Sequence, residues 1–285
     1  MPGEFLQIGE KKIEIRDLPT IPSVHNKILK IIEDINYSVE EVSGLIEKDH
    51  VLSSKVLKLV NSPSYGLNNK VASVRRGVIL LGANLIRGII LSTSLFKGSG
   101  EEMPGIWDHS YCTSAIAGLL ARRYNLITIE ELMTGALLHD IGRVLLYRYL
   151  KEEMVYLNDI VATKKINMLE AERLILGKGH DEIGWWLAKV WNFPPIIEDI
   201  IRFHHAPSEA ENNVKAVSIV HLSNIMSKAI GITYGSDPYI APFDPVCLTV
   251  MDSLEFDITD IASDAVEMVE SDSALKIYIE EPANG

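Results

Sequence analysis

The feature that most constrains the fold is an apolar stretch with a charged residue inside it. Residues 134–146 read TGALLHDIGRVLL, an apolar helical pattern that is interrupted by His139 and Asp140. Burying an unpaired carboxylate among leucines is costly, so Asp140 needs a compensating partner. That partner can be a metal ion, another side chain or water at a helix edge. Gly142, two residues after Asp140, would let a neighbouring backbone approach closely.

Helical periodicity dominates the rest of the chain. Apolar residues recur at three- and four-residue steps over residues 23–35, and similar patterns predict helices over residues 106–124, 180–191, 214–230 and 258–270. Two capping-box patterns, Ser38 with Glu41 and Thr128 with Glu131, mark further helix starts. We find no convincing strand pair and no repeat of fixed period. The sequence therefore predicts an all-α fold.

One segment divides the chain into two helical lobes. Residues 97–105 read KGSGEEMPG and combine three glycines, a proline and two acids, which is typical of a linker. We therefore expect a two-lobed helical bundle with a tail. Its parts are an N-terminal helical subdomain, a second helical subdomain and a C-terminal tail with an acidic helix, at residues 14–98, 99–231 and 232–285.

Charge disfavours some partner classes. Lys and Arg number 27 against 39 Asp and Glu, which gives a net charge of −12. Broad contact with nucleic acid or with an anionic membrane is therefore not expected. Arg75, Arg76 and Arg87 form a local basic cluster, which we interpret as a solvated helix face.

Cysteine usage and hydropathy indicate a cytoplasmic protein. Cys112 and Cys247 lie far apart and make no disulfide framework, which favours a reducing compartment. The first residues lack the apolar core of a signal peptide. The most apolar segment, residues 77–96, carries Asn84 and Arg87 near its middle, so we expect a buried core helix and no membrane span.

Histidines are concentrated in the second half of the chain. Of eight histidines, helical spacing directs five toward the interior of one bundle, from four different helices: His109, His139, His180, His204 and His205. Imidazole and carboxylate together are ligands for iron, manganese, nickel or zinc, and coordination would compensate Asp140. A hydrogen-bonded polar cluster is the alternative. We expect His25 and His50 at the surface and His221 in a structural hydrogen bond.

The order of these residues resembles the HD phosphohydrolase superfamily, notably its HD-GYP branch. The surrounding sequence is more similar to the HDOD family, named as an HD-related output domain. The similar blocks are LPTIPSVHNKILKII, LIEKDHVLSSKVLKLVNSPSYG, SVRRGVILLGANLIRGIIL, GALLHDIGRVLL and WWLAKVWNFPPIIEDIIRFHHAP. The resemblance covers about residues 17–231. It implies an all-helical, two-lobed bacterial domain used in signalling and regulation, with residues 99–231 as its HD-like part.

The resemblance also implies a metal-ligand set. Most HDOD members have lost part of the HD metal site, whereas this chain keeps positions that match the two-metal HD-GYP ligands: His109, His139, Asp140, His180, His204 and His205. The last acidic ligand falls at Asn224, whose neutral oxygen would weaken a second ion, so one or two divalent ions are expected. Arg143 falls where that branch carries a lysine; it could contact a phosphate or form a surface ion pair.

Departures from the HD-GYP pattern favour a regulatory role. No DGxGYP-like segment follows the His204–His205 pair, and this removes the feature associated with cyclic di-GMP hydrolysis. We therefore expect a non-catalytic signalling module that binds a protein partner, with contacts near residues 61–66 and 75–87, and we assign no catalytic residue. The alternative is a metal-dependent phosphohydrolase acting on a nucleotide, cyclic dinucleotide or phosphomonoester. A phosphate-containing small ligand that switches partner binding would join the two.

Overall fold

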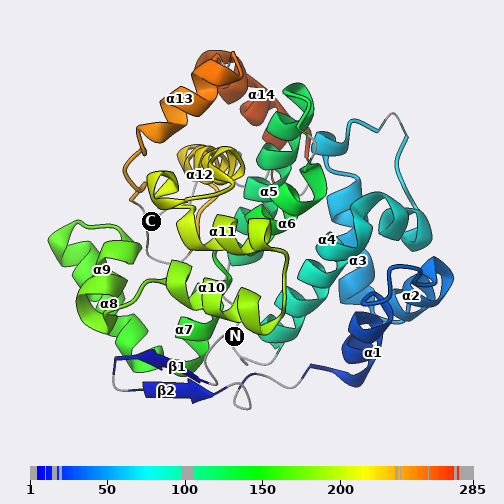
Figure 1. The fold of residues 1–285 in the computed structure, drawn as a ribbon, viewed down its shortest axis with the longest axis horizontal. Helices are drawn as coiled ribbons and strands as arrows, with labels where there is room; N and C mark the ends of the chain where they lie inside the picture. Colours follow the sequence, from blue (N-terminus) through cyan, green and yellow to red (C-terminus); the bar gives the residue numbers. More distant parts are fainter. Residues whose placement is uncertain are drawn as a thin grey trace.

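The computed structural model describes residues 5–9, 11–14, 18, 21–67, 69–97, 105–126, 128–234, 237, 239–255, 257–272 and 275. Its architecture is two-lobed and all-α, apart from one small hairpin (Figure 1). Residues 98–104, which make up most of the predicted linker, lie outside the described residues. The proposed division at residues 14–98, 99–231 and 232–285 stays a prediction.

The first lobe consists of α1 (Ser23–Ile31), α2 (Val39–Ile46), α3 (His50–Val60), the short 3-10 helix η2 (Pro63–Tyr65) and α4 (Val74–Lys97). The capping box predicted at Ser38 is confirmed, because its side chain accepts a hydrogen bond from the Glu41 backbone N–H. The NSPSYG segment, residues 61–66, follows the end of α3. Its last residue, Gly66, has a φ of 58°, in the left-handed region that favours glycine.

Helix α4 is bent at Gly82, where φ is 77° and ψ is 172°. The Glu130 carboxylate from the second lobe accepts a 2.8 Å hydrogen bond from the Asn84 backbone N–H and so caps the second half of α4. A side chain at Gly82 would collide with this carboxylate. Residues 74–95 are long and apolar enough to cross a membrane, but 67% of that window is buried inside the molecule. This agrees with the predicted core helix.

The second lobe is built around α5 (Ile106–Arg123) and α6 (Ile129–Leu138), which pack on each other. Around them lie α7 (Ile141–Tyr149), α8 (Lys151–Lys164), α9 (Met168–Leu176), α10 (His180–Val190), α11 (Pro195–Phe203), the 3-10 helix η3 (Pro207–Glu209) and α12 (Val214–Ala229). Helix α6 begins where predicted, but the Thr128 capping box is wrong. The Thr128 side chain makes no capping hydrogen bond, and its backbone (φ −101°, ψ 44°) is not the extended conformation typical of a capping residue.

A small hairpin contradicts the expectation that no strands pair. Strands β1 (Phe5–Ile8) and β2 (Lys11–Glu14) are antiparallel, and they lie at the lower edge of Figure 1 below α7. Leu6, Ile8 and Ile13 point inward and join the hydrophobic core of the second lobe. Each strand has only four residues, so the alternating pattern is too short to distinguish from chance.

The C-terminal region folds back onto its own chain. It contains α13 (Val246–Ser253) and α14 (Ile258–Ser271), and α14 is the predicted acidic helix. Helix α14 packs on α5, where Arg123 pairs with Asp260 at 3.0 Å and also with Asp264. The Tyr111 hydroxyl donates to the Asp272 carboxylate at the end of the helix. Ile261, Ala265, Met268 and Val269 of α14 are buried in the same hydrophobic core as residues of α5, so the acidic helix covers an apolar surface of the same molecule.

Candidate metal centre

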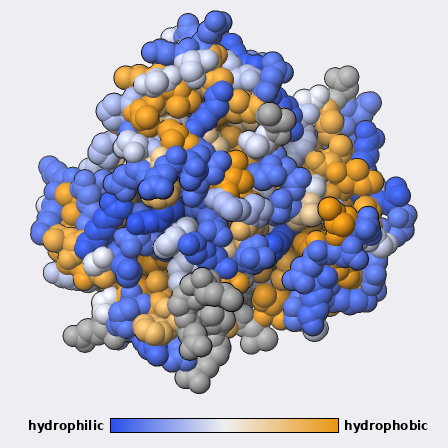
Figure 2. Space-filling view, viewed as in Figure 1, coloured by the Kyte–Doolittle hydropathy of each residue, from blue (hydrophilic) through white to orange (hydrophobic). Residues whose placement is uncertain are grey.

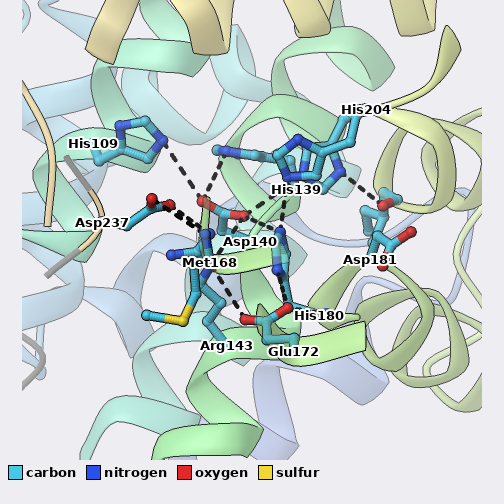
Figure 3. Close-up of polar contacts among 12 residues, drawn as sticks. His109, His139, Asp140, Arg143, Met168, Glu172, His180, Asp181, His204 and Asp237 are labelled. Atoms are coloured by element: carbon cyan, nitrogen blue, oxygen red, sulfur yellow. Dashed lines mark hydrogen bonds and ion pairs between the residues drawn. The ribbon is translucent and has the colours of Figure 1, made fainter. Parts of the chain in front are cut away.

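The predicted histidines converge on the Asp140 carboxylate (Figure 3). His109 lies on α5, His180 begins α10, and the His204–His205 pair follows the last residue of α11. His139 and Asp140 occupy the short break between α6 and α7, so both side chains are presented at a helix junction. Five helices, α5, α6, α7, α10 and α11, thus meet where the apolar stretch is interrupted.

Asp140 is 2% exposed and lies between two groups of imidazoles. Its Oδ2 is 3.1 Å from His139 Nε2 and 3.6 Å from His109 Nε2. Its Oδ1 is 3.0 Å from His180 Nε2 and 3.6 Å from His204 Nε2. Two sets of side chains could therefore hold a metal ion: His109, His139 and Asp140, and Asp140, His180, His204 and His205.

The outer nitrogen of four rings is held by a fixed acceptor. Each Nδ1 is within hydrogen-bond distance of one oxygen: His109 of the Ile232 carbonyl (2.8 Å), His139 of the Ala136 carbonyl (2.7 Å), His204 of the Ile201 carbonyl (2.9 Å) and His180 of the Glu172 carboxylate (2.6 Å). In His109, His139 and His204, donation from Nδ1 leaves the Nε2 lone pair directed at the cluster centre, as in histidines that bind metals.

The centre of the cluster contains acceptors without donors. Nε2 of His109, His139 and His204 is buried and has no hydrogen-bond partner among the described residues. Buried polar atoms are normally satisfied, so orphaned acceptors from several residues at one point require an explanation. A divalent cation would satisfy all of them, and imidazole with carboxylate is a donor set that suits such an ion.

Electrostatics prepare most of these groups for ligation at neutral pH. Burial, assisted by the neighbouring imidazoles, lowers the pKa of His109 to about 3 and that of His204 to about 4. Burial would also lower the pKa of His180, but the Glu172 carboxylate outweighs this effect and raises the pKa of His180 to about 9. Burial would raise the pKa of the Asp140 carboxyl, but His139 and Arg143 outweigh this effect and hold that pKa well below its usual range. An ion bound by His180 would therefore displace a proton.

Arg143 is buried, so the surface ion pair considered for it is wrong. The side chain is 3% exposed because its face of α7 packs inward. Its Nη2 is 3.1 Å from Asp237 Oδ2, and its Nε is 3.9 Å from both Asp140 Oδ1 and Glu172 Oε1. The alternative contact with a phosphate stays a prediction.

Asn224 lies on the face of α12 that borders the cluster. One turn before it, His221 Nδ1 donates to the His204 carbonyl at 2.8 Å, which confirms the structural hydrogen bond expected for His221. One turn after it, Ser227 Oγ is 3.3 Å from His109 Nδ1. Asn224 is buried and its Oδ1 has no hydrogen-bond partner in the described part of the chain. Its role as a weak ligand stays a prediction.

The two N-terminal histidines differ in exposure. His50 is exposed, as expected. His25 is 1% exposed, so its expected surface position is wrong. Its Nδ1 is 2.8 Å from Ser94 Oγ and its Nε2 is 3.0 Å from Asp49 Oδ2. These bonds tie α1 to α4 and to the start of α3, which accounts for a buried histidine outside the metal cluster.

Two contributors to the site are not evident from the sequence. Glu172 is fully buried on α9 and also accepts from the His180 backbone N–H at 2.8 Å, so it fixes that ligand twice. The Tyr234 hydroxyl donates to Asp140 Oδ2 at 2.6 Å, and its ring centroid is 5.3 Å from that of His109. For Glu172, an acidic residue on the apolar face of an amphipathic helix is only a weak sequence signal for a functional role. Tyr234 follows α12 in an irregular segment with no periodicity to read.

Helices α7 and α10 approach unusually closely at Gly142. A Cβ at this position would lie 2.0 Å from the His180 carbonyl oxygen and 2.7 Å from the Gly184 backbone nitrogen. The expected close backbone approach is therefore confirmed. It brings His180 within reach of Asp140, two residues before Gly142.

Comparison with known proteins identifies similar sequences. The sequence profile of the HDOD domain matches residues 18–207, more than half of the chain. A protein of Treponema pallidum (strain Nichols), described only as uncharacterized, is 28% identical over 230 residues. That match covers 79% of this chain and 44% of the relative, so the chain spans less than half of the relative's length.

Solved structures share the fold. An HDOD domain protein of unknown function from Geobacter sulfurreducens is 26% identical, with a TM-score of 0.61 over 88% of this chain and 93% of that one. A candidate phosphohydrolase from Shewanella amazonensis SB2B is 21% identical (TM-score 0.66, covering 93% and 96%). A candidate signal transduction protein from Marinobacter aquaeolei VT8 is 19% identical (TM-score 0.67, covering 93% and 59%).

Proposed function

We propose that this chain, which belongs to the HDOD family, is a cytoplasmic signalling module that acts through protein contacts and keeps a metal centre without turnover. Structures with the same fold carry the names of both a signal transduction protein and a phosphohydrolase, so fold alone does not choose between the two functions. The proposal therefore depends on the site itself.

The enclosure of the cluster is the observation that carries this proposal. His109, His139, His180 and His204 are fully buried, and Asp140 is nearly so. Within the described part of the chain these ligands are therefore enclosed, which supports a centre that holds an ion and is not open to a nucleotide.

We assign the ion to the two ligand sets that share Asp140. Iron, manganese, nickel and zinc all suit imidazole with carboxylate. The set His109, His139 and Asp140 would hold one ion, and the set Asp140, His180, His204 and His205 the other. Because Asn224 contributes no charge, the ion that it serves would be bound more weakly.

The surface of the first lobe supports a protein partner. Leu67, Ile79 and Leu80 are 37%, 53% and 38% exposed and lie within or beside the predicted contact regions. Hydrophobic atoms also gather over this lobe on the right of Figure 2. Arg75 is paired with Glu40 at 2.8 Å, and Arg87 donates to the Asn192 carbonyl at 3.2 Å. Because these two arginines already have partners in the chain, a protein partner would contact the apolar side chains of this surface more than its basic ones.

A metal-dependent phosphohydrolase is the second candidate. It is favoured by one observation, the carboxylate shared by two adjacent ligand sets, which is the donor arrangement expected of two-metal hydrolysis. In that case the bound ions would supply Lewis acidity. Asp140 would anchor them, and Glu172 would orient His180.

Assays with candidate substrates separate the two functions. Protein loaded with iron, manganese, nickel or zinc is incubated with phosphomonoesters, nucleotides and cyclic dinucleotides, beside the Asp140→Ala variant. We expect no metal-dependent phosphate release from either protein. Turnover by the wild type that disappears in Asp140→Ala would replace the regulatory proposal with the hydrolase.

A further inference from the structure

The acidic helix α14 lies over one of the two regions where the sequence predicts contact with a protein partner. It packs on α5 and on η2, which forms the middle of residues 61–66, and it lies at the top of Figure 1. Leu67 of the exposed first-lobe surface directly follows these residues. We call the surface that α5 and η2 present to α14 the α5–η2 face. A partner that contacts residues 61–66 from this side meets α14 first.

The α5–η2 face binds one apolar stripe of α14. Four residues of the helix, at steps that keep them on one side, are buried in the hydrophobic core that they share with α5: Ile261, Ala265, Met268 and Val269. The other side of the helix is open to solvent, since Ile258 and Val266 are 47% and 39% exposed. Burial of a single stripe at this spacing is how a protein groove recognises an amphipathic helix.

Basic side chains at the end of α5 border this stripe. Arg123 pairs with Asp260 at 3.0 Å and also with Asp264. Arg122, the residue before it, donates to the Ser64 carbonyl and so joins α5 to η2. Residues 257–272 contain six acids and no lysine or arginine. The α5–η2 face therefore fits a helix that is both amphipathic and acidic.

The polar contacts that hold α14 lie largely at the surface. Arg123, Asp260 and Asp264 are 35%, 59% and 36% exposed at their side chains, and ion pairs as exposed as these contribute little to stability. The Tyr111 hydroxyl adds a hydrogen bond to Asp272 where the helix ends. Helix α14 lies beyond residues 18–207, where the HDOD profile matches, and it carries no member of either metal-ligand set. Its departure would leave those ligands in place.

We propose that the α5–η2 face is a docking site for an acidic amphipathic helix of a protein partner and that α14 occupies it as an intramolecular competitor. The inference rests on the proposed signalling function, to which it adds the kind of partner and the place where it binds. A helix tethered to the same chain competes at an effective concentration of the order of millimolar. A partner helix would therefore bind weakly until α14 is displaced.

The test uses the full-length protein and a labelled peptide with the sequence of residues 257–272 as the probe. Fluorescence anisotropy compares the wild type with an opened variant that carries Ile261→Asp and Val269→Asp, which put charges on the buried stripe of α14. The matched control carries Ile258→Asp and Val266→Asp, which add the same charges on the exposed side. We expect the opened variant to bind the peptide about tenfold or more tightly than the wild type, and the control to match the wild type.

A milder variant keeps the test valid if the opened variant does not fold. Asp260→Asn with Asp264→Asn removes the ion pairs to Arg123 and leaves the apolar stripe intact. The weakened α14 should allow the peptide to bind about two- to threefold more tightly than in the wild type. A peptide that itself carries Ile261→Asp and Val269→Asp should bind none of the proteins, because its apolar stripe is broken.

Two outcomes would overturn the proposal. Equal peptide affinity of the wild type and of the variants that weaken α14 would leave α14 as a fixed part of the fold. A wild-type dimer in light scattering that is absent in the opened variant would assign the α5–η2 face to the α14 of a second copy of this chain. The titration measures neither metal content nor phosphate release, so its failure is distinguishable from failure of the proposed function.

Discussion

The Tyr234 hydroxyl donates a 2.6 Å hydrogen bond to Oδ2 of Asp140, the carboxylate that both ligand sets share. Tyr234 lies beyond residues 18–207, where the HDOD profile matches. The candidate metal centre is therefore completed by a residue outside the matched region. Burial and the nearby Asp140 raise the pKa of Tyr234, against the opposing effect of Arg143, so the hydroxyl stays a donor at neutral pH.

Removing the Tyr234 hydroxyl should weaken metal binding. Tyr234→Phe keeps the ring but leaves Asp140 without the donor that fixes its orientation, and loss of such outer contacts typically costs about tenfold or more in metal affinity. Competition with a chelator measures this affinity. Tyr156→Phe, at a side chain that is 51% exposed, is the control and should behave as wild type. Unchanged affinity in Tyr234→Phe would show that the hydroxyl does not support the site.

The close contact of α7 with α10 should tolerate no side chain at Gly142. A methyl group there meets the backbone of His180 and Gly184, which cannot rotate away. We expect Gly142→Ala to lower the free energy of unfolding by about 1–3 kcal/mol, measured by urea denaturation. Gly44→Ala is the matched control, since that helical glycine has nothing within 4 Å of an added Cβ, and it should be neutral or stabilising. Equal effects of the two substitutions would contradict the close approach.

The stability of the metal-free protein should be greatest near pH 6.5. The pKa of His180 rises from 6.5 to about 9 on folding, so its contribution is complete below pH 6.5 and is lost as the pH rises toward 9. The pKa values of His109 and His204 fall from 6.5 to about 3 and about 4, so their contributions are complete above pH 6.5 and are lost on acidification.

Urea unfolding from pH 5 to pH 9 with a chelator present measures this dependence. The alkaline decrease should be of the order of 3 kcal/mol and should disappear in His180→Gln. A wild type whose stability does not change between pH 6.5 and pH 9 would exclude a protonated His180 held by Glu172.

Several features of the fold and site could be predicted because they are local or periodic. The helix start at Ser38 follows from the capping pattern, and the inward direction of His109, His139 and His180 follows from helical spacing. These sequence patterns depend only on residues within a few helical turns of one another. The Asp140 charge in an apolar run could likewise be recognised as needing a partner.

The remaining features depend on contacts that local patterns do not encode. Tyr234 and Asp237 reach the site from beyond α12, where no periodicity in the sequence indicates which side chain points inward. His25 is buried by Ser94 and Asp49, which lie 69 and 24 residues away in the sequence. Helical spacing also cannot show that Arg143 is enclosed by acids from other elements.

The most direct test of the metal centre is elemental analysis of the protein purified without chelator. We predict about one divalent ion per chain or more, lost in His139→Ala together with thermal stability, whereas His50→Ala, at an exposed histidine, keeps both. Absence of any such ion, with no rise in melting temperature on adding iron, manganese, nickel or zinc, would contradict the account.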